Sequence, residues 1–594
     1  MQLSIVKIRS LIGLIQGILL AILYTASQKM SWPATQPSMF VPLSLIALFI
    51  PFIWLQGINN LRLKTLGVWT AFAALLLLGI GYYSVFRQML PYDDVSVSPA
   101  PAGTLVFFTT IAFIIAHSLV LSSDHDGRWI ANYPTYFDMA WKMVVQVLFA
   151  AMFVLGLWII LELGASLFSA IGLTFFQKLI NHSWFAIPVT TIATSIALHI
   201  TDVNVKIVQG IRTLSLMLLS WLLPLITGIV AIFLISLCFT GVNLLWKTGY
   251  ATSLLLSATS LLVLLINAVY QDGGRVSETS NVLRFTAPIA CCLLSPLLVV
   301  AMYALNVRVQ QYGWTVNRIE GAAFMLMLAC YALGYIAAVW SSPWLKRLEI
   351  CNVLSAYFML LVYLAIFSPL ADPARLAVAS QIARLESGKV APERFDFGML
   401  RLQGLRYGQE ALIELQAHFK GLDAAYTSEQ VKKLLALKKG QVVEMKTGVL
   451  STVQKADLIN VHTNEGKLPE SFLNQDWRLF EKQVSFVDSL VLPSCLSGYY
   501  PRCDAWVMEY NNNPPVILIL APSGFIGIKQ DAQGVWNIIG GWALPFKCTN
   551  ILRDAREGRF KVVAPSSPAE PDIQFDGWRT SFRGNSTLNS QSCK

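Results

Sequence analysis

Long apolar runs are the feature that most constrains how this chain can fold. A helix needs about 20 mainly apolar residues to cross roughly 30 Å of hydrocarbon with every backbone amide hydrogen-bonded inside the segment. Hydrophobic residues make up 55% of the 594 residues and charged residues only 13%, which excludes an ordinary soluble protein. We therefore predict that residues 1–371 form an all-α polytopic membrane bundle of about eleven transmembrane helices, near 10–28, 40–58, 65–86, 103–123, 142–163, 184–201, 214–237, 251–270, 285–305, 320–341 and 350–371.

After residue 371 the apolar runs stop, and the pattern predicts a soluble α+β domain. Residues 372–440 have apolar residues at helical spacing in three stretches and predict a helical neck. Residues 441–594 predict a β-rich domain, because Pro514–Trp542 contains β-rich runs separated by Ser-Gly and Gln-Gly turn signals. The tail after Pro565 is rich in Ser, Pro and Asn, so we expect disorder there unless Cys593 is bonded.

The distribution of basic residues excludes a nucleic-acid partner and predicts an orientation. The formal charge of +10 divides into +7 before residue 372 and +3 after it, so the basicity belongs to the membrane loops. With the N-terminus in the cytoplasm, an odd number of spans puts residues 372–594 outside it. The cytoplasmic segments then hold twelve Lys and Arg residues and the opposite segments six, namely Lys7, Arg9, Arg62, Lys64, Arg128, Lys142, Lys206, Arg212, Arg275, Arg284, Lys346 and Arg347 against Lys29, Arg87, Lys178, Lys247, Arg308 and Arg318.

One segment can reverse this orientation. The apolar core of Ala165–Ile180 is too short to span, so we interpret it as interfacial or re-entrant. If it crosses the membrane, the number of spans becomes even and the C-terminal domain changes sides.

The cysteines provide a partly independent indication of compartment. Four of the nine lie in the soluble domain, at Cys495, Cys503, Cys548 and Cys593. An even set in an oxidising compartment predicts two disulfides with three connectivities, of which we favour Cys495–Cys503. The alternative is free thiols in a cytosolic domain.

Glu162 is an acidic residue inside a predicted span. A charge at the centre of a membrane helix costs about 2.5–3.5 kcal/mol on insertion scales, so such residues are default functional candidates. Because Glu162 lies within about one turn of the helix end, we prefer the interpretation that it reaches the interface or caps the following backbone.

Two histidines and two aspartates form the sharpest candidate site. His117 and His199 lie toward the cytoplasmic ends of their predicted spans, near Asp126 and Asp202. Imidazole titrates near neutral pH and carboxylates bind cations, so the four residues suit a proton or cation site. The alternative that we prefer is separate interfacial histidines hydrogen-bonded to helix carbonyl groups.

Motifs of familiar enzyme classes are missing from the sequence. Asp124–Gly127 (DHDG) lacks the other oxygen ligands of a calcium loop, so we interpret it as a turn. Ala521–Phe525 (APSGF) lacks the first Gly of a nucleophile elbow. We expect no catalytic residues, no metal and no cofactor, and lean against an enzyme.

The stretch Ser368–Leu415 resembles a bacterial multi-pass membrane family catalogued as a domain of unknown function, number four-one-five-three. The resemblance runs from the first helix to the neck and implies an integral membrane protein with no assigned activity. The positions that carry it are Ser368, Pro369, Asp372, Ser380, Gln381, Arg384, Leu385, Gly388, Asp396, Leu400, Tyr407 and Gly408.

These observations together predict an uncharacterised protein of the bacterial inner membrane whose C-terminal domain is periplasmic. The paucity of buried charge and the sizeable exported domain favour a module for sensing, scaffolding or partner binding. The alternatives are a secondary transporter or lipid translocator, and a membrane-embedded envelope-modifying enzyme. Expected partners are the lipid bilayer and envelope proteins or a small solute.

Overall fold

The structure is a computed structural model that describes residues 2–88, 100–241, 251–274, 279–392 and 395–418, with shorter stretches between 427 and 580. The chain divides into two compact units. The membrane unit comprises residues 1–392 and 397–439, and the sheet unit comprises 393–396 and 440–594. Each unit is described by itself.

The predicted membrane bundle is confirmed. Within the described residues, eleven helical segments are long and apolar enough to cross a membrane. One of them, residues 205–240, consists of two consecutive helices, α8 and α9. The helices of these segments are α1 (Gln2–Gln28), α2 (Pro37–Gly57), α3 (Leu63–Phe86), α4 (Gly103–Asp126), α5 (Tyr133–Ala170), α7 (Ser183–Val203), α8 (Val205–Ser220), α9 (Leu223–Thr240), α11 (Ala251–Tyr270), α12 (Asn281–Tyr312), α13 (Val316–Val339) and α14 (Arg347–Ile366).

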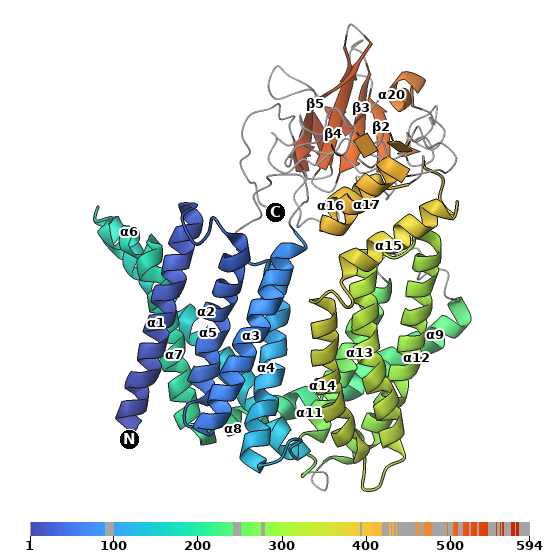
Figure 1. Cartoon of the computed structure of the whole chain (residues 1–594). Helices are drawn as coiled ribbons and strands as arrows, with labels where there is room; N and C mark the ends of the chain where they lie inside the picture. Colours follow the sequence, from blue (N-terminus) through green and yellow to red (C-terminus); the bar gives the residue numbers. More distant parts are fainter. Residues whose placement is uncertain are drawn as a thin grey trace. The chain divides into compact units, whose positions relative to one another are not determined.

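Two apolar clusters account for most of the packing inside this bundle. In the first, α2, α3 and α4 pack together around Leu45, Leu77 and Phe113 (Figure 1). In the second, α11, α12 and α13 pack around Ile266 and Leu294 (Figure 1).

Helix α1 packs on α7 through small residues rather than through bulky side chains. A Cβ atom placed on Gly17 of α1 would lie 2.5 Å from Cα of Pro188 in α7. Close backbone approach of this kind is a common way to associate membrane helices, because lipid supplies little hydrophobic drive.

The segment Ala165–Ile180 does not form a span of its own. Its first residues complete α5, which ends at Ala170, and a turn then leads to the seven-residue helix α6 (Phe175–Asn181). Phe176 of α6 packs back on Phe168 of α5, with ring centroids 5.7 Å apart. Because seven residues rise only about 10 Å, α6 is too short to cross a bilayer.

The neck begins at α15 (Pro373–Glu386) and continues with α16 (Phe397–Leu402) and α17 (Leu405–His418). All three belong to the membrane unit. The third predicted neck stretch, residues 428–440, falls largely outside the described residues.

The sheet unit contains a five-stranded sheet in the order β1-β2-β3-β4-β5. Its elements are β1 (Ile459–Val461), α20 (Glu470–Asn474), β2 (Cys503–Met508), β3 (Val516–Ala521), β4 (Gly524–Gln530) and β5 (Trp536–Ala543). Strands β2 to β5 pair antiparallel as a meander, and β1 joins β2 in parallel. The predicted soluble α+β domain is therefore confirmed.

Alternation along β3 and β4 builds the core of this sheet. Ile517 faces Ile528 and Ile519 faces Ile526 across the two strands, and all four are buried in one cluster. Successive side chains point to opposite faces of a strand, which explains why every second residue enters this core.

A second sheet consists of β6 (Lys561–Val563), β7 (Asp572–Phe575) and β8 (Trp578–Thr580), all antiparallel. Strands β7 and β8 lie after Pro565, so the expectation of disorder in that tail does not hold for these residues. Their backbone groups find partners in neighbouring strands, which composition alone does not reveal.

Candidate functional site

The buried carboxylate of Asp372 organises the start of the neck. Asp372 follows α14 and is fully buried. Its Oδ1 accepts hydrogen bonds from the backbone amides of Ala374 at 2.8 Å and Arg375 at 3.4 Å. These amides belong to the first turn of α15 and have no partner within the helix, so Asp372 acts as the N-cap.

The other oxygen of Asp372 ties the neck to α3. Its Oδ2 accepts a hydrogen bond of 2.7 Å from the Tyr83 hydroxyl and lies 3.2 Å from the Arg87 guanidinium. The Tyr83 hydroxyl also lies 2.8 Å from the hydroxyl of Tyr407 in α17. One buried carboxylate thus joins the end of α3 to both α15 and α17.

A backbone contact and a cation–π contact reinforce this end of α3. The backbone amide of Arg406 donates to the carbonyl of Arg87 at 3.0 Å. The Arg406 guanidinium lies 4.2 Å from the centroid of the Phe86 ring, within the range of a cation–π interaction.

A second set of contacts holds α15 on the end of α12. Arg384 donates to the carbonyls of Gln310 at 3.2 Å and Gln311 at 2.9 Å. Gln381 donates to the carbonyls of Tyr312 and Trp314, both at 2.9 Å. The last carbonyls of a helix lack partners within it and carry partial negative charge, so an arginine and an amide donor suit them.

Gly313 makes this second set of contacts sterically feasible. It ends α12 at φ +75°, in a region that favours glycine. A Cβ atom there would lie 2.6 Å from Cδ of Arg384 and 2.7 Å from Nε2 of Gln381. We call the two sets of contacts together the neck clamp; its members are Tyr83, Arg87, Asp372, Tyr407, Gly313, Gln381 and Arg384.

Chemically, the neck clamp is a joint in which most polar groups pair with one another; the buried Nε of Arg384 has no hydrogen-bond partner among the described residues. Both oxygens of Asp372 accept from protein donors, and Arg384 and Gln381 are directed at backbone carbonyls. Such an arrangement fixes the neck on the bundle, because opening it would leave the Asp372 charge without its partners.

Two of the four residues of the predicted proton or cation site lie together. Asp202 forms ion pairs of 2.7 Å with Arg9 and with Lys142. His199 Nδ1 lies 3.3 Å from the same Arg9, which is only 2% exposed. Asn60 and Gln146 also donate toward Asp202, each at 3.4 Å. We call Arg9, Lys142, His199 and Asp202 the Asp202 cluster.

The other two residues have different partners. His117 is fully buried in the bundle, where the indole nitrogen of Trp69 donates to its Nδ1 at 3.0 Å. Asp126 accepts from the backbone amide of Asn132 at 2.8 Å and from the Thr135 hydroxyl at 3.0 Å, so it organises the turn between α4 and α5. Within the described residues, no three His, Cys, Asp or Glu side chains are grouped to hold a metal ion.

Glu162 is exposed on α5, and the side-chain amide of Gln177 in α6 donates to its Oε2 at 3.4 Å. Cys503 is buried on β2, whereas Cys495, Cys548 and Cys593 lie outside the described residues. The pairing of these cysteines therefore stays a prediction.

Several residues of these sites were not singled out from sequence. Arg9, Arg87 and Lys142 entered the sequence analysis only in the count of loop charges, and Tyr83 did not enter it. A usable signal existed for Gly313, since glycine is common directly after the end of a long helix. For Arg9 the pattern offered no signal, because its partner is 193 positions away.

Comparison with known families gives a match for most of the chain. Residues 18–415 match the family described as Domain of unknown function (DUF4153), which is more than half of the chain. No curated protein and no solved structure shows a significant match. The matched range includes the bundle and the clamped neck up to α17, whereas β1 to β8 lie beyond it. The resemblance noted in the sequence is thereby confirmed, and the chain belongs to the DUF4153 family.

Proposed function

We propose that this protein is an integral inner-membrane protein of the bacterial envelope that carries a periplasmic module for sensing, scaffolding or partner binding. The neck clamp is the observation that carries the proposal. It immobilises the segment that leads from the last span toward the sheet unit, at both α3 and α12. A neck fixed at two helices of the bundle suits a base that presents an appended module.

The family match supports a division of labour between the two units. Asp372, Gln381, Arg384 and Tyr407 are among the positions that carry the family resemblance, and each is a member of the neck clamp. The match ends at residue 415, inside α17. A membrane base with a fixed neck, followed by a unit outside the family match, suits a scaffold that presents a separate module.

Three observations support the periplasmic placement of the module. The twelve-to-six distribution of basic residues favours a cytoplasmic N-terminus. Eleven candidate spans among the described residues, with α6 too short to be another, give an odd number. Four cysteines in the C-terminal region suit an oxidising compartment, where we propose two disulfides, including Cys495–Cys503.

The rival function that we considered is a secondary transporter or lipid translocator. Its best ionisable candidate was Asp202, but Arg9 and Lys142 both lie 2.7 Å from this carboxylate. A substrate cation would have to approach two protein cations, which Coulomb repulsion opposes in a partly buried site. We therefore propose a structural role for the Asp202 cluster, in joining α1, α5 and α7.

Reporter fusions test the placement of the module. Alkaline phosphatase is fused after Ser368, Gly440 and Lys594, with a cytoplasmic fluorescent protein at the same positions as the matched control. We expect phosphatase activity and no fluorescence at all three. Fluorescence at these positions would overturn the periplasmic placement.

Complementation of a deletion strain tests the function of the module. A chain ending after Gly440 retains the bundle and the neck, so we expect it to insert at the normal level but not to restore the phenotype of the deletion. Full restoration by this shortened chain would overturn the proposal and assign the function to the bundle itself.

A further inference from the structure

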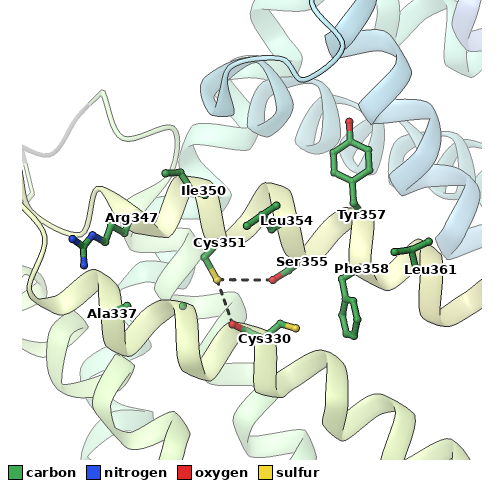
Figure 2. Close-up of a pocket in the computed structure, with 11 residues that line it drawn as sticks. Cys330, Ala337, Arg347, Ile350, Cys351, Leu354, Ser355, Tyr357, Phe358 and Leu361 are labelled. Carbon is green, nitrogen blue, oxygen red and sulfur yellow. Dashed lines mark hydrogen bonds between the residues drawn. The ribbon is translucent and has the colours of Figure 1, made fainter.

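A groove between α13 and α14 carries an inference that is independent of the proposed function. It encloses about 630 Å³, a volume typical of small-molecule sites. Its lining is mostly apolar and includes Ala337, Leu354, Phe358 and Leu361 (Figure 2). Both helices are candidate spans, so the groove opens onto the hydrocarbon of the bilayer.

The thiol and hydroxyl groups in the middle of the groove have partners within the protein. The Cys351 thiol donates to the carbonyl of Cys330 at 3.5 Å and lies 3.9 Å from the Ser355 hydroxyl (Figure 2). The helices approach closely at this point, since a Cβ atom on Gly334 would lie 2.1 Å from Sγ of Cys351. The middle of the groove therefore suits an apolar chain rather than a polar ligand.

One end of the groove is different, because Arg347 lies there (Figure 2). Its side chain is exposed, and in the part of the chain that the structure describes its guanidinium makes no hydrogen bond or ion pair. The neighbouring Lys346 is paired with Glu349 at 2.8 Å. Trp340, which is 73% exposed at the end of α13, marks this level as the membrane interface.

The groove is long enough to extend through one leaflet. Its lining extends along α14 from Arg347 to Leu361, which corresponds to about 21 Å of helix. Half of the hydrocarbon core is about 15 Å, so the groove reaches from the interface through one leaflet. A molecule with an anionic head at Arg347 and an acyl chain beyond it would fill this space.

We propose that the groove between α13 and α14 is a binding site for one anionic glycerophospholipid. The acyl chain lies between the helices, beside Leu354 and Leu361, and the phosphate group pairs with Arg347. This phosphate supplies the partner that the guanidinium otherwise lacks among the described residues.

Photolabelling tests the acyl-chain part of the proposal. The full-length protein is reconstituted in phosphatidylcholine vesicles containing a phosphatidylglycerol with a diazirine on its acyl chain, and adducts are mapped by mass spectrometry. Leu361 in the groove and Leu225 on α9 are both 63% exposed, so they form a matched pair. We expect several-fold more labelling at Leu361. Equal labelling, or protection of Leu361 by a second copy or another helix, would overturn the site.

Substitution of Arg347 tests the headgroup. Arg347→Gln is expected to lower labelling of the groove about fivefold, the effect of one basic residue at an anionic membrane surface. Arg284→Gln is the control, because Arg284 is also exposed and lies at the same end of the bundle. A diazirine phosphatidylcholine should label the groove less than the phosphatidylglycerol probe. Equal labelling by the two probes, or an equal effect of the two substitutions, would overturn the anionic headgroup.

A bulky side chain in the groove gives a third measurement. Ala337→Phe fills the lining and is expected to abolish labelling at Leu361, whereas Leu333→Phe, on the exposed side of α13 and outside the lining, is not. Unchanged labelling in correctly inserted Ala337→Phe would contradict the proposal. If that variant does not insert, the matched pair of leucines and the Arg347→Gln variant still decide the question.

Discussion

Two substitutions of Asp372 distinguish its two roles, as the N-cap of α15 and as the charged acceptor that holds the neck on α3. Asp372→Ala removes an N-cap, which costs about 0.5–2 kcal/mol. It also leaves Tyr83 and Arg87 without their acceptor, and hydrogen bonds to a charged group contribute about 1.5–3 kcal/mol each. Breaking a buried ion pair costs about 3–5 kcal/mol in total. Arg87 is 18% exposed and regains some hydration, so we expect the lower end, about 3 kcal/mol.

Asp372→Asn is the informative companion variant. Asparagine caps a helix about as well as aspartate, so the backbone amides of Ala374 and Arg375 keep an acceptor. The amide nitrogen that replaces Oδ2 cannot accept from Tyr83 or Arg87, so these contacts and the charge are lost while the cap is kept. The expected cost therefore falls by that of the cap, to about 1.5 kcal/mol. Glu386→Gln, at the exposed end of α15, is the matched control for removing one negative charge and should have almost no effect.

Hydrogen exchange of the α15 amides in the full-length, membrane-reconstituted protein measures these costs. Since about 1.4 kcal/mol corresponds to a factor of ten, exchange should accelerate more than a hundredfold in Asp372→Ala and about tenfold in Asp372→Asn. Peptides from α12 and α13 should exchange at the original rate. Wild-type exchange of α15 in Asp372→Ala would refute the inference that this carboxylate holds the neck.

Three further substitutions test other parts of the structure. Asp202→Ala leaves the buried Arg9 and the neighbouring Lys142 without their carboxylate, so thermal unfolding in detergent should show a loss of about 3–5 kcal/mol in stability. The double variant Arg9→Met with Asp202→Leu should recover much of this loss, and equal melting of the single and double variants would contradict the reasoning. Gly313→Ala places a side chain at a positive φ and against Arg384, so trypsin should cleave the neck faster than in wild type. The control Gly228→Ala, where a Cβ meets nothing within 4 Å, should not change cleavage, and wild-type cleavage of Gly313→Ala would count against the contacts that hold α15 on α12. Trp536→Ala removes a ring that is 2% exposed and packs edge-on against Phe472, so the sheet unit should lose about 3–5 kcal/mol of stability while the unfolding transition of the bundle is unchanged. The control Val535→Ala, whose side chain is 43% exposed, should lose little. A shift of the bundle transition in Trp536→Ala would contradict the division into two units.

Much of the membrane unit was predictable from local sequence. Crossing a bilayer requires one continuous apolar segment whose backbone groups are paired within it, so each span is visible in its own residues. For the same reason the seven-residue α6 was separable from the spans. The antiparallel β3, β4 and β5 were predictable because two turn signals interrupt residues that alternate between core and surface.

The structure places the four residues of the candidate proton or cation site at more than one location. His199 and Asp202 are three positions apart on α7, so their closeness follows from helical spacing. We expected His117 to lie near these two residues, which requires the corresponding ends of α4 and α7 to be neighbours. Instead, His117 accepts a hydrogen bond from the indole nitrogen of Trp69 in α3. Which neighbour a buried helix face meets depends on the packing of the bundle, which no single helix encodes.

The sequence by itself therefore determined the number and approximate positions of the spans, the family and the presence of a C-terminal β-rich region, whereas helices such as α5 (Tyr133–Ala170) extend well beyond the predicted 142–163. Only the tertiary structure decided which polar groups meet: Tyr83 with Asp372 across 289 positions, and Arg9 with Asp202 across 193. The physical reason is that membrane insertion and strand alternation are properties of contiguous residues, whereas a buried ion pair depends on the mutual packing of helices that are distant in the chain.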